Sequence, residues 1–130
     1  MPKIYCDSST KEACFIVEGQ KAVVLLYPVP VTVNVGEYKS VILALEEAKR
    51  RKLKQVELLT DSQLVVLQVY GVWTCRAQQL LPLRDKVREL VQDLGAVVGW
   101  ITREQNLAGK ELENKPKPIA KTSAQDARYP

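Results

Sequence analysis

The sequence predicts an α/β protein with a mixed sheet of five strands, three antiparallel and then two parallel, flanked by helices. Three short segments rich in β-branched residues come first and are close enough in sequence to form a meander. A long amphipathic helix follows, and the remaining strands alternate with helices. Because neighbouring parallel strands need crossover connections, this order places the later strands parallel in the same sheet.

The first three predicted strands span residues 3–6, 13–18 and 21–27. The third is followed by Pro28 and Pro30, which have no backbone N–H to donate within a central strand. We therefore expect the third strand to lie at an edge of the sheet or to bulge there, and it could run on through residues 31–33.

A helix is predicted over residues 37–51, because Val41, Ala44, Leu45 and Ala48 recur at helical spacing with charged residues on the other side. Periodicity and helix-end signals define the later elements. In order, these are a strand at residues 55–59, helices at 62–70 and 80–94, a strand at 96–102 and a last helix at 106–113, capped by Asn106.

The length of 130 residues, with 46% hydrophobic and 26% charged residues, suits one domain with a hydrophobic core. We assign residues 1–114 to this domain and residues 115–130, which begin with a proline-containing segment, to a polar, flexible tail. The most apolar stretch, residues 22–35, is shorter than the roughly 20 apolar residues needed to cross a bilayer. The first residues resemble neither a signal nor a transit peptide, so we expect a cytoplasmic protein without a membrane partner.

The residue types exclude several chemistries. The chain has no histidine, which excludes Ser-His-Asp catalysis, Cys-His catalysis and histidine zinc sites. Cys6, Cys14 and Cys75 form no Cys-x-x-Cys motif and are interpreted as reduced, buried thiols. The formal charge of +4 favours a polyanionic partner without identifying it. Without histidine or a Cys-x-x-Cys motif, any metal must be bound by oxygen.

Carboxylates stand at three junctions between predicted elements: Asp7, Glu37 and Asp61. Acidic residues brought together at one end of a sheet make a site for divalent cations. Each also has a structural interpretation. Asp7 could form a turn, Asp61 could cap a helix, and Glu37 could pair with Asn34 in a variant capping box.

Longer blocks around these carboxylates carry a family resemblance. The block TDSQLVVLQVYGVWTCRAQQLLPLRDKVRELV, residues 60–91, closely resembles the central part of type 1 ribonucleases H of archaeal and bacterial kind. Upstream, TVNVGEY is similar to the family's Thr-Asn-Asn-x-(Ala/Gly)-Glu-Tyr, and downstream ITREQN is similar to Val-Pro-Arg-Glu-Gln-Asn. The resemblance covers nearly all of residues 4–113 and implies a ribonuclease H-like, reverse-transcriptase-like domain.

The resemblance also implies a function: hydrolysis of the RNA strand of an RNA/DNA hybrid with Mg²⁺ or Mn²⁺. In such a mechanism two ions about 4 Å apart bracket the scissile phosphate, one activating a water and the other stabilising the leaving oxygen. Asp7, Glu37 and Asp61 match the family's first three acidic ligands, with Asp7 bridging both ions.

The fourth acidic position departs from the family. The register set by Asn106 and Leu112 in the pattern Asn-x-x-Ala-Asp-x-Leu places Lys110 where an aspartate is expected, and a protonated lysine is no ordinary ligand. Three outcomes are open. Glu111 could replace the lost carboxylate, or the Lys110 ammonium could take part of the second ion's place, leaving slower or one-metal cleavage. Alternatively, catalysis is lost and a nucleic-acid-binding or interaction module remains.

Residues for substrate binding are also implied by the resemblance: Ser8 beside the metal site, Asn34 and Gln63 toward sugar or minor-groove edges, and Trp73 with Arg76 as a wall for the DNA strand. Each could instead be a cap, an exposed polar residue or a packing aromatic. The turn after the first aspartate lacks the glycines usual in the family, so hybrid recognition is expected to be altered. A nuclease of this superfamily acting on structured DNA or RNA is a further alternative.

Overall fold

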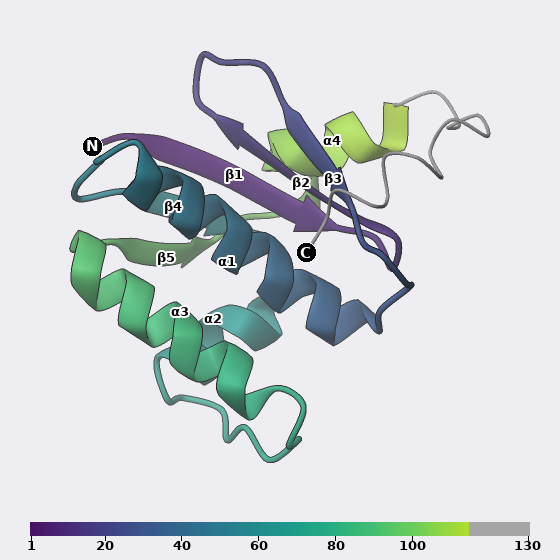
Figure 1. Ribbon diagram of the computed structural model, residues 1–130, viewed down its shortest axis with the longest axis vertical. Helices are drawn as coiled ribbons and strands as arrows, with labels where there is room; N and C mark the ends of the chain where they lie inside the picture. Colours follow the sequence, from purple (N-terminus) through teal and green to yellow (C-terminus); the bar gives the residue numbers. More distant parts are fainter. Residues whose placement is uncertain (115–130) are drawn as a thin grey trace.

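A computed structural model, which describes residues 1–114, confirms the predicted fold class (Figure 1). One mixed five-stranded sheet has the order β3-β2-β1-β4-β5. Its strands are β1 (Lys3–Ser8), β2 (Glu12–Val17), β3 (Val23–Leu26), β4 (Glu57–Thr60) and β5 (Val97–Trp100). β2 pairs antiparallel with β1 and β3, whereas β4 runs parallel to β1 and β5. The carboxyl ends of β1, β4 and β5 therefore meet at one edge of the sheet.

The described helices are α1 (Val33–Arg50), α2 (Gln63–Val69), α3 (Leu81–Leu94) and α4 (Leu107–Asn114), with a 3₁₀ turn, η1 (Arg103–Gln105). α1 lies across the sheet with α3 beside it, and α4 packs against β1 and β2 (Figure 1). No helix within residues 1–114 is long and apolar enough to span a bilayer.

The hydrophobic core lies between the sheet and α1 with α3. Ile4 and Cys6 alternate along β1 and are fully buried, as expected when every second strand residue faces the helices. Tyr38 and Leu45, on the buried side of α1, belong to the same core cluster as Ile4 and Cys6. This packing fixes where α1 lies relative to the end of β1.

Two element boundaries near the metal-binding candidates differ from the prediction. α1 begins at Val33 rather than residue 37, because Thr32 is its N-cap and accepts a hydrogen bond from the Val35 N–H. Glu37 is therefore in the second turn of α1. The segment before Asn106 forms η1, a turn that the sequence did not predict, and Thr102 closes it through a capping box.

Other predictions hold or lie outside the described residues. β3 is an edge strand, as predicted, but it ends at Leu26 and does not run on past the two prolines. The cysteines are buried and none of the three forms a disulfide. The predicted polar tail, residues 115–130, lies outside the described residues, so the domain division remains a prediction.

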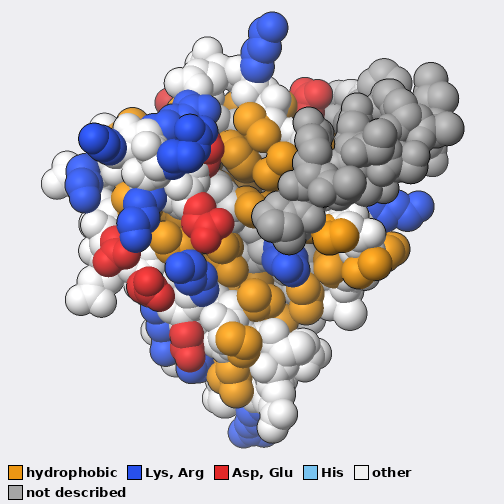
Figure 2. All heavy atoms as spheres, in the orientation of Figure 1, with side chains coloured by type: hydrophobic (Ala, Val, Ile, Leu, Met, Phe, Trp, Pro, Cys, Tyr) orange, Lys and Arg blue, Asp and Glu red, His pale blue; other side chains and the backbone are white. Residues whose placement is uncertain are grey.

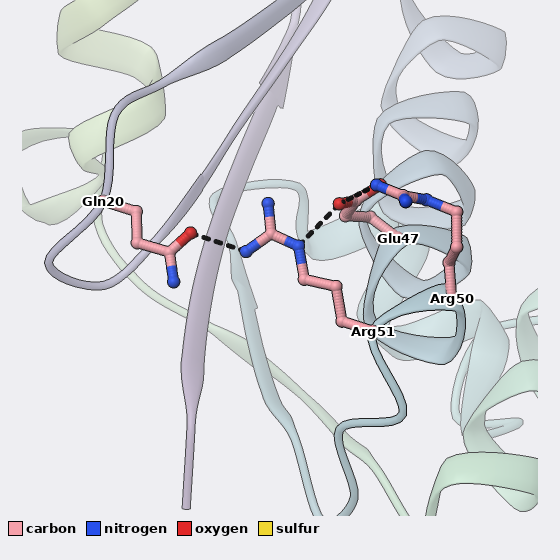
Figure 3. A network of polar contacts seen from close by, with 4 residues as sticks. All are labelled: Gln20, Glu47, Arg50 and Arg51. Atoms are coloured by element: carbon pink, nitrogen blue, oxygen red, sulfur yellow. Dashed lines mark hydrogen bonds and ion pairs between the residues drawn. The ribbon is translucent and has the colours of Figure 1, made fainter.

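Basic side chains gather over the C-terminal end of α1, at the upper left of Figure 2. Two of them are paired: Glu47 accepts hydrogen bonds from Arg50 and Arg51, and Arg51 also donates to Gln20 in the turn between β2 and β3 (Figure 3). Basic groups here also oppose the negative end of the helix dipole. This cluster therefore stabilises the helix end, far along α1 from Glu37.

Candidate metal centre and active site

Three carboxylates from separate elements meet at the edge where β1 and β4 end. Asp7 lies in β1, Glu37 in α1, and Asp61 directly after β4. One carboxylate oxygen from each residue lies within 4.8 Å of the other two. The parallel pairing of β1 with β4 and the packing of α1 on β1 bring these positions together.

The predicted caps and turn at these carboxylates are absent, although the Asp7 carboxylate does accept a hydrogen bond from the Ser8 backbone. The N-caps of α1 and α2 are Thr32 and Ser62, whose side chains accept backbone hydrogen bonds, so neither Asp61 nor the Asn34-x-x-Glu37 pattern caps a helix. Asp7 is paired with Cys14 within the sheet and forms no turn. Local backbone capping therefore does not account for this carboxylate cluster.

Burial and mutual repulsion raise the pKa values of Asp7 and Glu37. The pKa of Asp7 is raised from 3.8 to about 6, first by burial and then by the charge of Asp61. The pKa of Glu37 is raised from 4.5 to about 8, again mainly by burial, with further contributions from Asp7 and Asp61. A bound cation would favour the ionised forms of both groups.

One buried atom of the cluster has no partner. Glu37 Oε1 is buried and has no hydrogen bond within residues 1–114. A buried polar oxygen without a partner is costly, and such an atom in a native structure calls for an explanation such as a missing ion or water. Carboxylate oxygens are also the ligands that Mg²⁺ prefers. The donor set therefore fits a divalent cation.

Asn106 ties the cluster to the start of α4. Its fully buried amide donates hydrogen bonds to the Cys6 carbonyl oxygen at 2.9 Å and to Asp61 Oδ2 at 3.3 Å. Its Oδ1 accepts from the Ala108 N–H at 3.1 Å, which confirms the predicted helix cap. The bond to Asp61 was not predicted. It fixes one carboxylate oxygen of Asp61.

Gly109, the residue before Lys110, lies against the carboxylates. A Cβ atom added to Gly109 would lie 3.1 Å from Asp7 Oδ2, so a larger residue there would press on this carboxylate. Lys110 and Glu111 are both exposed. Glu111 does not belong to the carboxylate cluster found among residues 1–114.

A pair of exposed charged residues, Arg103 and Glu113, also acts on the cluster. Arg103 in η1 lowers the pKa of both Asp7 and Glu37, while Glu113 in α4 raises that of Asp7. The two side chains form an ion pair of 3.7 Å. Arg103 was missed as a site residue, although it stands in the ITREQN segment that carried the family resemblance.

Ser8 makes structural contacts. Its hydroxyl donates to the Ser9 carbonyl oxygen at 2.6 Å and shares a 2.8 Å hydrogen bond with the Tyr27 hydroxyl. The Tyr27 hydroxyl also lies 3.3 Å from the Gly36 carbonyl oxygen, and a Cβ on Gly36 would lie 2.5 Å from Ser8 Oγ. Ser8 therefore joins the ends of β1 and β3 to the first turn of α1, next to Glu37.

The other predicted substrate contacts are exposed but scattered. Asn34 and Gln63 lie in the first turns of α1 and α2. Trp73 and Arg76 lie in the segment between α2 and α3, and the Trp73 side chain keeps 45% of its surface accessible. Their exposure is compatible with substrate binding, which remains a prediction for all four.

Comparisons with known proteins identify relatives over most of the chain. A family model described as reverse transcriptase-like matches residues 16–115. The bifunctional protein Rv2228c of Mycobacterium tuberculosis is 31% identical over 94 residues, which are 72% of this chain and 26% of that protein. An uncharacterized protein of Mycobacterium bovis matches to the same extent. The chain thus spans about a quarter of the length of these curated relatives.

Solved structures agree with the fold. RNase H1 from the halophilic archaeon Halobacterium salinarum superimposes with a TM-score of 0.76 and 25% identity, covering 85% of this chain and 92% of that one. LC11-RNase H1, solved in complex with an RNA/DNA hybrid, gives a TM-score of 0.73 and 25% identity, covering 86% and 93%. The described domain thus matches nearly the whole of both structures.

Proposed function

Because the chain belongs to the reverse transcriptase-like family and has the ribonuclease H fold, we propose that it is a divalent-metal-dependent endonuclease that cuts the RNA strand of RNA/DNA hybrids. The observation that carries the proposal is the cluster of Asp7, Glu37 and Asp61, with one oxygen of each within 4.8 Å of the others. The hybrid bound by the similar LC11-RNase H1 supports the choice of substrate. The formal charge of +4 suits a polyanion.

In this proposal Asp7, Glu37 and Asp61 hold Mg²⁺ or Mn²⁺. Bound divalent ions would supply an activated water and stabilise the charge on the leaving oxygen. The protein's own contribution is preorganisation: β1 buries Asp7, and Asn106 fixes one oxygen of Asp61. The Arg103 guanidinium offsets part of the negative charge on Asp7 and Glu37 before the cation binds.

The substitution at position 110 weakens a two-metal mechanism. Two divalent ions bring four positive charges, whereas the cluster offers three carboxylates and no acidic residue at Lys110. We therefore propose that the second ion is held less tightly than the first and that cleavage is correspondingly slow. Mn²⁺ prefers oxygen ligands, as Mg²⁺ does, but binds most of them more tightly. We therefore expect faster cleavage with Mn²⁺ than with Mg²⁺.

Lys110 also favours a second candidate function, a ribonuclease H-like module that binds nucleic acid or another partner without cutting it. The two candidates share the fold and the carboxylates but differ in turnover. They also differ in what the removal of a carboxylate does, because binding alone does not need a complete metal site.

One assay separates these candidates. Labelled RNA/DNA hybrid, double-stranded RNA and single-stranded RNA are incubated with Mg²⁺ or Mn²⁺ and the wild type, Asp61→Asn or Asp85→Asn. Asp85 is an exposed residue of α3 and serves as the matched control. We expect hybrid cleavage by the wild type and Asp85→Asn, and a loss of more than about a hundredfold in Asp61→Asn. Tight hybrid binding without cleavage in either metal would instead support the module.

A further inference from the structure

Trp100, the last residue of β5, is bonded to the backbone of Asp61, one of the three carboxylate residues. In the parallel register of β4 and β5 it pairs with Thr60, the residue before Asp61. Its indole Nε1–H donates a hydrogen bond to the Asp61 carbonyl oxygen at 3.2 Å. The ring is therefore held beside the residue whose carboxylate contributes to the metal-binding candidate.

The remaining surface of this indole is apolar and open. Trp100 keeps 46% of its surface accessible, and its one polar atom is already bonded to Asp61. What it presents to solvent is thus the aromatic ring without a polar group. An exposed large aromatic ring next to a cation site is a typical contact for nucleic acid, because aromatic rings pack on bases and sugars without needing a particular sequence.

We propose that Trp100 is a binding contact for the nucleic-acid strand at the carboxylate cluster, and that its ring packs on the sugar of the nucleotide next to the bound phosphate. This inference rests on the proposed function, since it needs a phosphate at the cluster. Consecutive nucleotides of one strand are only about 3.4 Å apart along the helix axis. A strand that holds a phosphate at Asp61 would therefore bring its next nucleotide near the indole that is bonded to the Asp61 carbonyl oxygen.

Trp73 provides an internal comparison. It is the chain's other tryptophan and is equally open, with 45% of its surface accessible, but it lies in the segment between α2 and α3. Trp100 is distinguished by its hydrogen bond to Asp61. Because the chain has two tryptophans, replacing either one leaves the other as the sole indole fluorophore.

The first test compares Trp100→Leu and Trp100→Phe with the wild type in hybrid binding, measured by fluorescence anisotropy, and in Mn²⁺ binding, measured by calorimetry. We expect Trp100→Leu to raise the Kd for hybrid about 5- to 20-fold, in the lower part of the range for aromatic contacts. Trp100→Phe, which keeps a ring but loses the N–H, should retain most of the affinity. The Kd for Mn²⁺ should stay within about twofold in both variants.

Two results would overturn the inference. Wild-type hybrid affinity in a folded Trp100→Leu protein would show that the ring contacts nothing in the complex. An equal loss in Leu and Phe variants with weakened Mn²⁺ binding would mean that Trp100 acts by positioning Asp61. If neither the wild type nor any variant binds or cuts the hybrid, the proposed function itself is wrong.

The second test uses emission from the single remaining tryptophan. In Trp73→Phe with Asp7→Asn, which prevents cleavage, hybrid should protect Trp100 from acrylamide quenching by at least about twofold. Single-stranded RNA and single-stranded DNA of the same sequence serve as separate arms. Protection by RNA but not by DNA assigns the contacted sugar to the RNA strand, and the reverse assigns it to the DNA strand. Unchanged quenching while anisotropy reports bound hybrid would contradict the proposal.

Discussion

Removing the Asp7 carboxylate should stabilise the metal-free protein while it abolishes activity. Asp7 is almost fully buried, with 3% of its surface accessible, and its pKa is raised from 3.8 to about 6 by burial and by Asp61. Each pKa unit corresponds to about 1.4 kcal/mol, so keeping Asp7 ionised in the folded state costs about 3 kcal/mol above pH 6. Asp7→Asn removes this cost and also relieves the repulsion on Glu37.

The direction of the pH dependence follows from the raised pKa. Between about pH 4 and 6 the folded protein binds more protons at Asp7 than the unfolded chain, so the stability contributed by protonated Asp7 is complete below about pH 4 and is lost as the pH rises through 6. Glu37 extends the same trend toward pH 8. The stability advantage of Asp7→Asn over the wild type should therefore grow by about 2 to 3 kcal/mol from pH 4.5 to 7 in EDTA.

The measurement is urea unfolding of wild type, Asp7→Asn and the exposed control Asp85→Asn at several pH values, each with EDTA or with Mg²⁺. Metal at about ten times its Kd should add about 1.4 kcal/mol to the wild type and nothing to Asp7→Asn. The control should follow the wild type throughout. A pH-independent difference between wild type and Asp7→Asn would refute the electrostatic reasoning, even if activity were lost.

Three further predictions concern the surroundings of the cluster. Asn106→Ala should lower the free energy of unfolding by about 2 to 4 kcal/mol, because it removes a helix cap and leaves the buried Cys6 carbonyl oxygen without this hydrogen bond. It should also weaken Mn²⁺ binding, because it releases Asp61. An unchanged Mn²⁺ affinity in calorimetry would contradict this role of Asn106. Gly36→Ala should lower the free energy of unfolding by about 1 to 3 kcal/mol in urea, because its Cβ would lie 2.5 Å from Ser8 Oγ, whereas the double variant with Ser8→Gly should recover much of the loss. Lys110→Asp should increase the hybrid cleavage rate and the number of Mn²⁺ ions bound, and a rate at or below that of the wild type would count against a weakened second-ion site at this position.

Most elements of the fold could be predicted, because their signals are local. Strand propensity, the two prolines after β3 and the helical spacing of Val41, Ala44, Leu45 and Ala48 each depend on neighbours in sequence. The start of α1 was misplaced for a local reason as well. The cap at Thr32 was overlooked in a valine-rich segment that resembles a strand.

The candidate site was only partly predictable. Asp7, Glu37 and Asp61 were singled out from their positions at element junctions and from the family resemblance, and the structure brings them together. The role of Asn106 in holding Asp61 was not foreseen, since it depends on atoms 45 residues apart in sequence. The proximity of Arg103 depends in turn on how η1 folds back toward β1.

The sequence by itself determined most element types, their order and the oxygen-only chemistry of any metal site, because these follow from residue identity and short-range spacing. That Lys110 stands where an acidic residue is expected is what the family resemblance implies. The tertiary structure decided which groups share one environment. Burial and proximity raise the pKa values of Asp7 and Glu37, leave Glu37 Oε1 without a partner among residues 1–114, and set the Trp100 ring beside Asp61. These properties depend on desolvation and on distances across the fold, which no local pattern of residues specifies.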